Sequence, residues 1–338
     1  MIKPVLSIIE SDRPEKWQEI LADLISEPKE LVEFLGLDPE ARPSSLAACT
    51  DFPMKVPKPF AARMMRGNWN DPLLKQVWPD IAEELKDDSL VADPLQEAQF
   101  NRQPGLLHKY QGRVLLTAAP HCAIHCRYCF RRHFDYQSNT PGRAQWRSSL
   151  DYIAADNSIA EVILSGGDPL AAPNGYLGWL LGELDSIPHV QTIRIHTRLP
   201  VVIPQRIDAG LLSLLGNLGS RCVIVMHCNH PNEIDHAVTK SIEALGEDGH
   251  ILLNQAVLLK GINDEVNVLS ELSHALFACG VLPYYLHLPD QVAGTGHFLV
   301  SEHEAVALID SLQAELPGYL VPKLVKEEPG QASKTRLV

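Results

Sequence analysis

Three cysteines lie close together in the stretch HCAIHCRYCFRRHF, which spans residues 121–134. Cys122, Cys126 and Cys129 have the spacing C-x₃-C-x₂-C, and no fourth cysteine lies nearby. Thiolates are preferred ligands of zinc and of iron–sulfur clusters. A [4Fe-4S] cluster usually takes four thiolates, so three would leave one iron open for a ligand that the protein does not supply. The residues alone also allow a structural zinc site completed by a nearby histidine, or buried free thiols.

The chain around this loop alternates short apolar runs with helical segments. The apolar runs are residues 113–119, 160–167, 192–203, 221–228, 251–260 and 283–288. The candidate helices lie near residues 145–155, 174–186, 208–217, 232–247, 265–279 and 301–315. Continuous apolar strands that alternate with helices indicate a parallel sheet covered by helices. An open doubly wound sheet and a partial barrel both fit this order, and in both the functional loops lie at the carboxyl ends of the strands.

Polar residues lie toward or just beyond the carboxyl ends of these predicted strands, where functional loops are expected. They are the three cysteines and Gly166, Gly167, Asp168, His196, Arg198, His227, Gln255 and Asp290. One edge of the predicted sheet therefore collects the candidate site residues. Taken alone, the Gly-Gly-Asp sequence indicates only a turn at the end of a strand.

Composition and charge restrict the class of protein. Hydrophobic residues make up 45% of the 338 residues and charged residues 21%, which excludes a disordered chain. The formal net charge of −13 argues against a nucleic-acid partner, because such proteins need a basic surface. The start of the chain shows no secretory signal, and no apolar run is long enough to cross a membrane. The cysteines are not spaced as a disulfide framework, so we expect a cytoplasmic protein without a membrane partner.

The cysteine spacing, directly after the first predicted strand, resembles that of the radical S-adenosylmethionine (SAM) superfamily. This resemblance implies a [4Fe-4S] cluster on Cys122, Cys126 and Cys129, with SAM bound to the open iron. The aromatic residue between the last two cysteines, Tyr128, also fits the superfamily pattern. The residues that the resemblance places near SAM are Gly166, Gly167, Asp168 and, more weakly, His227.

Longer segments resemble one family within that superfamily. We find similarity to the lysine 2,3-aminomutases in PGLLHKYQGRVLL, CRYCFRRHF, SGGDPL, RLPVVIPQRI, NQAVLLKGIND, PYYLH and GYLVPK. The resemblance implies an α/β fold, with a partial (β/α)₆ TIM-like barrel of the radical SAM type over residues 101–338. Residues 1–100 would then form an N-terminal helical extension.

The resemblance also implies pyridoxal 5′-phosphate (PLP) as a second cofactor. Lys334 matches the family lysine that forms a Schiff base with PLP. Lys109 and Arg113 match basic positions suited to the PLP phosphate, and Gln255 is a further cofactor contact. Without the resemblance, a lysine so near the chain end would be interpreted as a flexible surface charge.

The implied substrate is L-lysine, held at both of its ends. Arg131 matches the arginine that binds the substrate carboxylate, for which a planar guanidinium is well suited. Asp290 and Glu327 match two acids that bind the ε-ammonium group, although the family has an aspartate at the second position. By itself, Glu327 would be interpreted as a solvent-facing charge in a charged run.

The short length of the chain resembles the branch of the family that supplies β-lysine for elongation factor P. The implied partners are elongation factor P, its β-lysine ligase, and an electron donor such as flavodoxin or ferredoxin. Two enzyme alternatives remain: an aminomutase that makes free β-lysine, and one that acts on arginine or another amino acid. A third alternative is a non-catalytic iron–sulfur or zinc protein that binds a translation factor.

Overall fold

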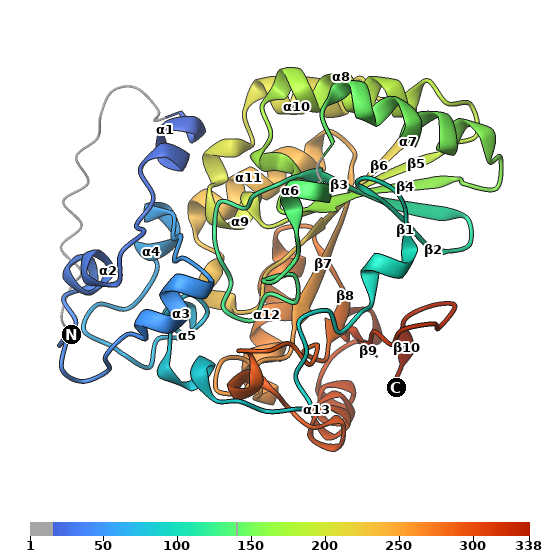
Figure 1. Cartoon of the computed structure of the whole chain (residues 1–338). Coiled ribbons are helices and arrows are strands. Elements are labelled where there is room, and N and C mark those ends of the chain that lie inside the picture. The colour runs from blue at the N-terminus through green and yellow to red at the C-terminus, as the bar shows by residue number, and fades with distance from the viewer. Residues whose placement is uncertain (1–15, 140) are drawn as a thin grey trace.

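A single ten-stranded sheet organises the molecule, and the strands follow one another in chain order (Figure 1). The computed structural model describes residues 16–139 and 141–338. The strands are β1 (Asn101–Gln103), β2 (Leu106–Tyr110), β3 (Arg113–Ala119), β4 (Glu161–Gly166), β5 (Thr192–Thr197), β6 (Arg221–Met226), β7 (Ile251–Val257), β8 (Leu282–His287), β9 (Lys323–Lys326) and β10 (Thr335–Arg336). Strands β3 to β9 are parallel, whereas β1, β2 and β10 pair antiparallel with their neighbours. The order never reverses, as it would in a doubly wound sheet, and the two edge strands do not pair, so the sheet is a partial barrel.

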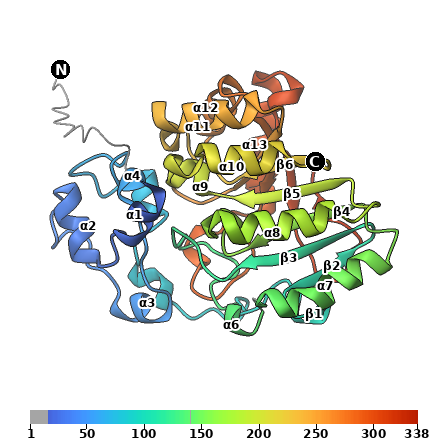
Figure 2. The ribbon, with the colours of Figure 1, turned by 90° about the horizontal axis from the view of Figure 1, so that it is seen from above.

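Helices follow each of the strands β3 to β8, and they cover the outer face of the sheet (Figure 2). In the barrel they are α6 (Tyr136–Asn139), α7 (Arg143–Ala155), α8 (Asn174–Asp185), α9 (Leu199–Val202), α10 (Ala209–Gly216), α11 (His236–Glu247), α12 (Val266–Ala278) and α13 (Glu302–Glu315). The 3₁₀ helices of the barrel are η3 (Pro169–Ala171), η4 (Pro204–Arg206), η5 (Pro231–Glu233), η6 (Gly296–Phe298) and η7 (Gly318–Leu320). The six strand–helix units confirm the predicted partial (β/α)₆ barrel, to which β9 adds a seventh parallel strand.

Apolar strands and capped helices explain why these units form. Ile193, Ile195 and Ile224 on neighbouring strands are fully buried beneath the helices. Side-chain caps start several of the helices: Asp208 accepts a hydrogen bond from the Leu211 backbone at α10, in the manner typical of N-caps. The sequence and the packing therefore agree on where most elements begin.

The run 192–203 was predicted as one strand, and this prediction is wrong in its second half. Strand β5 ends at Thr197, and residues Leu199–Val202 form helix α9. Pro200 lies in the first turn of α9, where its missing N–H costs nothing. The Asp168 carboxylate accepts hydrogen bonds from the backbone N–H groups of Arg198 and Leu199, at 2.7 Å and 3.2 Å, and so stabilises this helix start.

The N-terminal extension lies against the carboxyl ends of the strands (Figures 1 and 2). Its elements are α1 (Trp17–Ala22), α2 (Pro28–Leu35), α3 (Leu46–Asp51), α4 (Lys58–Ala61), α5 (Pro72–Lys75), η1 (Ile81–Glu84) and η2 (Glu97–Phe100). Arg63 links it to the barrel by donating to the carbonyl oxygens of Val201, at 2.6 Å, and Glu233. Residues 1–15, which carry most of the stretch that showed no secretory signal, lie outside the described residues. Within residues 16–139 and 141–338, no helix is long and apolar enough to cross a membrane.

Candidate active site

The cysteine loop joins β3 to α6 and brings its three half-buried thiols into one neighbourhood. Burial and the nearby carboxylate of Asp168 raise the pKa of the Cys122 thiol. Burial and the Cys126 thiolate raise the pKa of the Cys129 thiol to about 12. Three thiolates would therefore repel one another here unless metal ions balanced their charge. Among the described residues, no group of three His, Cys, Asp or Glu side chains is arranged to hold one metal ion. In a cluster each thiolate binds an iron of its own, so the donor set fits a [4Fe-4S] cluster better than a single zinc.

Arg198, which the sequence places among the polar residues at this sheet edge without a role of its own, belongs to this site. Its Nη1 donates to the Cys126 sulfur at 2.7 Å and to the Tyr128 hydroxyl at 2.8 Å. Its Nη2 pairs with Glu233 at 2.9 Å, and both side chains are almost fully buried. The guanidinium thus places a positive charge and a hydrogen-bond donor beside the predicted cluster ligand Cys126. The only sequence signal was the position of Arg198 just after β5.

His227, the residue after β6, packs against Tyr128 of the cysteine loop. Its Nε2 is 2.8 Å from the Tyr128 hydroxyl, and the two rings are stacked with centroids 5.7 Å apart. Burial and the charge of Arg198 lower the pKa of His227 to about 3, so the imidazole is neutral. The predicted contact of His227 with SAM stays a prediction.

The Gly166-Gly167-Asp168 segment runs from β4 into η3 and packs against the start of the cysteine loop, where the Asp168 backbone N–H donates to the His121 carbonyl oxygen at 3.0 Å. A Cβ atom at Gly167 would lie 2.3 Å from the carbonyl oxygen of His121, so only glycine allows this backbone approach. Gly166 has a φ of +110°, which other residues rarely adopt. The Asp168 carboxylate also accepts from the Thr197 hydroxyl at 2.7 Å. These contacts fix the segment beside the cysteine loop, and its predicted contact with SAM stays a prediction.

Lys334 and Glu327 face each other where the loop between β9 and β10 begins and ends. Lys326 pairs with Thr335 in the register, so the next residue of each strand lies across from the other. Lys334 Nζ is 2.5 Å from Glu327 Oε2, and the two side chains are only 23% and 17% exposed. The hairpin thus removes Lys334 from the flexible surface position that its place in the chain suggested.

The Glu327 carboxylate binds two further groups from β2. Lys109 Nζ donates to Glu327 Oε1 at 2.8 Å, and the Tyr110 hydroxyl donates to the same oxygen at 2.9 Å. Burial alone would raise the pKa of Glu327, but Lys334 and Lys109 outweigh it and lower that pKa. The Arg113 guanidinium lies over the Tyr110 ring, 4.8 Å from its centroid. The predicted basic positions therefore gather beside the predicted Schiff-base lysine.

Asp290, just beyond β8, belongs to the same group of charges. Burial and the negative charge of Glu327 raise the pKa of Asp290 to about 7, while Lys334 acts in the opposite direction. Gln255 lies on β7 opposite Tyr285 of β8. The Nε2 atoms of His196 and His287 are buried and have no hydrogen-bond partner within the described part of the chain. Such orphaned polar atoms near Lys334 fit an interior that receives a polar ligand.

Arg131, two residues beyond the last cysteine, is held by a carboxylate that sequence reasoning missed. Its Nε and Nη2 donate to Glu97 at 2.8 Å and 2.6 Å. Its Nη1 donates to the Ser165 hydroxyl, at 3.1 Å, on β4. Glu97 also helps to raise the pKa of Asp290, which places Arg131 and the acids in one region of charge.

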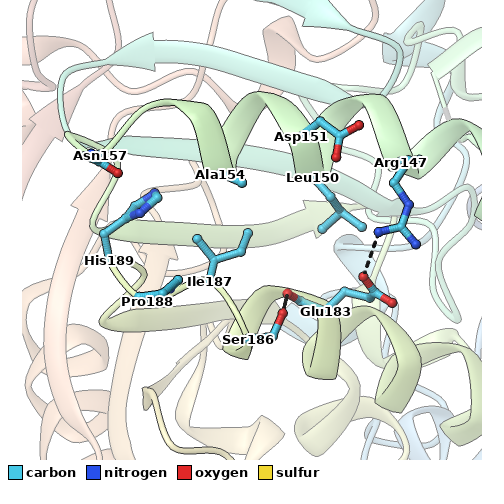
Figure 3. A pocket seen from close by; sticks show the side chains of 10 residues that line it. All are labelled: Arg147, Leu150, Asp151, Ala154, Asn157, Glu183, Ser186, Ile187, Pro188 and His189. Atoms are coloured by element: carbon cyan, nitrogen blue, oxygen red, sulfur yellow. Dashed lines mark hydrogen bonds and ion pairs between the residues drawn. The ribbon is translucent and has the colours of Figure 1, made fainter.

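Two surface hollows lie away from the candidate site residues. Figure 3 shows one of about 510 Å³ between α7 and α8, where Arg147 Nη1 pairs with Glu183 at 3.2 Å. Another of about 560 Å³ lies beside α3 and η1 in the extension. Neither hollow is lined by a residue that was predicted for the site. We therefore locate the site by its charged side chains and not by a surface hollow.

Comparison with known proteins gives full-length relatives of one activity. An L-lysine 2,3-aminomutase of Haemophilus influenzae is 47% identical over 321 residues, which cover 95% of each chain. An L-lysine 2,3-aminomutase of Escherichia coli is 44% identical and covers 96% of this chain and 94% of its own. No family model matches. A solved structure, Streptococcus suis SuiB bound to S-adenosylmethionine, is 14% identical with a TM-score of 0.47 over 69% of this chain and 54% of that one; this similarity is too low to support an inference.

Proposed function

The chain belongs to the lysine 2,3-aminomutase family, and we propose that it converts L-α-lysine to β-lysine for the modification of elongation factor P. The chain is an isomerase of that type. The observation that carries the proposal is the separation of charge in the site. Arg131 lies on the cysteine-loop side of the site, while Asp290 and Glu327 lie beyond β8 and β9 with Lys334.

This arrangement suits an amino acid that has a second ammonium group. The α-carboxylate of lysine would accept hydrogen bonds from the Arg131 guanidinium. Glu327 now pairs with the ammonium groups of Lys109 and Lys334. The ε-ammonium of the substrate would take the place of such a partner, with Asp290 as the second acid. A buried ammonium needs such carboxylates, because an unpaired charge is costly to bury. Glutamate lacks the second ammonium and would meet two carboxylates instead.

The cofactors form part of the same proposal. Cys122, Cys126 and Cys129 would hold the [4Fe-4S] cluster, and Lys334 would bind PLP with Lys109 and Arg113 nearby. When bound, the cluster with SAM supplies the radical, and PLP stabilises the radical during nitrogen migration. The chain itself would hold the substrate between Arg131 at one end of the site and the two acids, Asp290 and Glu327, at the other. Arg198 donates a hydrogen bond to the sulfur of Cys126, one of the three proposed cluster ligands.

The proposed partners rest on the similarity of the chain to one group of relatives. The chain is 47% and 44% identical to the Haemophilus influenzae and Escherichia coli relatives, but 34% identical to a relative from Clostridium subterminale. The chain therefore resembles the first two relatives more. We include transfer of β-lysine to elongation factor P by its ligase, with flavodoxin or ferredoxin as the electron donor.

Anaerobic reconstitution tests the proposal. The purified chain is loaded with iron, sulfide and PLP, and then incubated with SAM, a reductant and L-lysine. We expect β-lysine by mass spectrometry, and none from L-arginine under the same conditions. Elongation factor P with its ligase should then gain the mass of one β-lysine. Absence of β-lysine from a protein that carries both cofactors would contradict the substrate assignment.

A further inference from the structure

Glu97 makes a paired contact with Arg131 although it lies far from the cysteine loop in sequence. It is the first residue of η2, in the segment that leads from the extension into the barrel. Its two oxygens accept from Nε and Nη2 of Arg131, at 2.8 Å and 2.6 Å. The side chains of Arg131 and Glu97 are 5% and 13% exposed, so solvent screens this pair little. Two parallel hydrogen bonds fix the plane of a guanidinium as well as its position.

The remaining contacts of Arg131 define the edge that stays available. Nη1 donates to the Ser165 hydroxyl at 3.1 Å and, over a long 3.4 Å, to the Gly166 carbonyl oxygen. The guanidinium also lies near the ring of Phe130, 4.8 Å from its centroid. Glu97 occupies the edge formed by Nε and Nη2. A second carboxylate would therefore approach the edge formed by Nη1 and Nη2.

The segment that carries Glu97 is itself held in place. The Glu97 backbone N–H donates to the Asp93 carboxylate at 3.1 Å, which anchors the start of η2. Helix η2 runs directly into β1, which pairs with β2, the strand that carries Lys109. Glu97 therefore connects the arginine to the same sheet edge that supplies the cations beside Lys334.

We propose that Glu97 is a positioning residue for substrate recognition, because it orients Arg131 so that its Nη1–Nη2 edge meets the α-carboxylate of the amino acid. This inference rests on the proposed function. Without Glu97, the guanidinium would have to be ordered when the substrate binds. Binding would then lose the advantage of a preorganised site. The opposite role, a carboxylate that competes with the substrate for Arg131, predicts tighter binding after its removal.

The test distinguishes the contribution of the α-carboxylate to substrate binding from that of the rest of the substrate. The holoenzymes of wild type, Glu97→Ala and Glu97→Gln are compared for the KM of L-lysine and for inhibition by 1,5-diaminopentane, which is lysine without its carboxylate. We expect Glu97→Ala to raise the KM of lysine about tenfold, with Glu97→Gln in between, because an amide oxygen still accepts one bond. The inhibition constant of 1,5-diaminopentane should stay within about twofold, because it makes no contact with Arg131.

Two results would overturn the inference. An unchanged or lower KM for lysine would show that Glu97 is neutral or competes with the substrate. Equal losses for lysine and 1,5-diaminopentane would show a general structural effect. Glu97→Gln preserves size, so it answers the question if Glu97→Ala does not fold.

A matched control removes a carboxylate–arginine pair elsewhere. Glu183→Gln breaks the Arg147–Glu183 pair on the outer face, as drawn in Figure 3, and should leave both constants unchanged. Different results would contradict the proposed function and the role of Glu97. If wild-type holoenzyme neither binds nor converts lysine, the proposed function fails. If wild type is active and Glu97→Ala has the wild-type KM for lysine, only the role of Glu97 fails.

Discussion

Two carboxylates in this molecule each hold two cations, and the cations differ. Glu83, in the extension, accepts from Nε and Nη2 of Arg127 at 2.8 Å and 2.5 Å, and from Nη2 of Arg132 at 2.7 Å. All three side chains are at most 2% exposed. Arg127 and Arg132 flank Cys129 in the sequence, so Glu83 fixes the cysteine loop from outside.

Glu327 holds lysines in a less buried place. Its partners Lys109 and Lys334 are 11% and 23% exposed, and Glu327 itself is 17% exposed. Arginine does not lose its proton in proteins, whereas lysine can do so and can then act as a nucleophile. The ion pairs of Glu83 with Arg127 and Arg132 are therefore permanent, and we call these three residues the brace of the cysteine loop. The group around Glu327 can exchange partners, as the proposed binding of PLP and of the ε-ammonium there requires.

Removing the brace should have the largest effect. Glu83→Ala leaves two buried guanidinium groups without their carboxylate, which costs about 3–5 kcal/mol of unfolding free energy. We expect a large fall in the urea midpoint and little iron bound per chain after reconstitution. Glu327→Ala serves as the comparison and should lose much less stability. Equal losses for the two variants would remove the distinction between brace and exchangeable site.

Removing the proposed Schiff-base lysine should abolish activity without unfolding the protein. Lys334→Ala should lose the pyridoxal absorbance band and all aminomutase activity, since no other residue takes its place. Its unfolding free energy should change by less than about 1 kcal/mol, because the pair is partly exposed and Lys109 still neutralises Glu327. Lys326→Ala on the same hairpin is the control, since Lys326 pairs with Glu302 at 2.7 Å. It should retain the band.

Neutralising the acid of the exchangeable site should weaken substrate binding. Glu327→Gln keeps the side-chain size but removes the charge that we assign to the ε-ammonium. A loss of about 2 kcal/mol would raise the KM of lysine about 30-fold. Glu328→Gln is the neighbouring control, because Glu328 pairs with Lys326 at 3.2 Å and faces solvent more. A wild-type KM in Glu327→Gln would contradict the assignment.

Protonation of Asp290 should give a smaller, pH-dependent effect. Burial and the charge of Glu327 raise its pKa from 3.8 to about 7, with a lesser contribution from Glu97 and opposition from Lys334 and Lys109. Below pH 7 the neutral acid cannot balance an ammonium, so kcat/KM for lysine should rise with pH up to about 7. Asp290→Asn should remove this rise from the pH profile, at a lower activity.

The same shift has a consequence for stability. Because its pKa is raised in the folded state, Asp290 binds its proton more tightly there than in the unfolded chain. Its contribution to stability is therefore lost as the pH rises from about 4 to about 7. Asp290→Asn should flatten that part of the stability profile, as measured by urea unfolding at several pH values. A profile that is unchanged by the substitution would contradict the raised pKa.

Much of the barrel could be predicted from the sequence, because buried parallel strands are continuous apolar runs. The run RVLLTAA matched β3 at both ends. The short antiparallel strands escaped prediction, since β1 has the polar sequence NRQ and β10 has only two residues. Their pairing depends on neighbouring strands rather than on local propensity.

Candidate site residues could be selected from the sequence where a motif contained them. The three cysteines stand out by their spacing, and Lys334 and Glu327 were found only through resemblance to a family. Glu83 and Glu97 were missed because a single carboxylate in a polar segment has no periodic or local signal. Only the fold brings each to its arginine, 44 residues away for Glu83 and 34 for Glu97.

The β9–β10 hairpin has a further consequence for the modularity of this fold. Glu327 and Lys334 are seven residues apart and lie on opposite sides of one turn. The amine that we propose as the PLP lysine and the acid that we assign to the far end of the substrate therefore belong to one short segment. Exchange of residues 327–334 would alter both together without disturbing the parallel strands. Substrate scope could thus diverge through a single local segment while the cysteine loop and its brace stay constant.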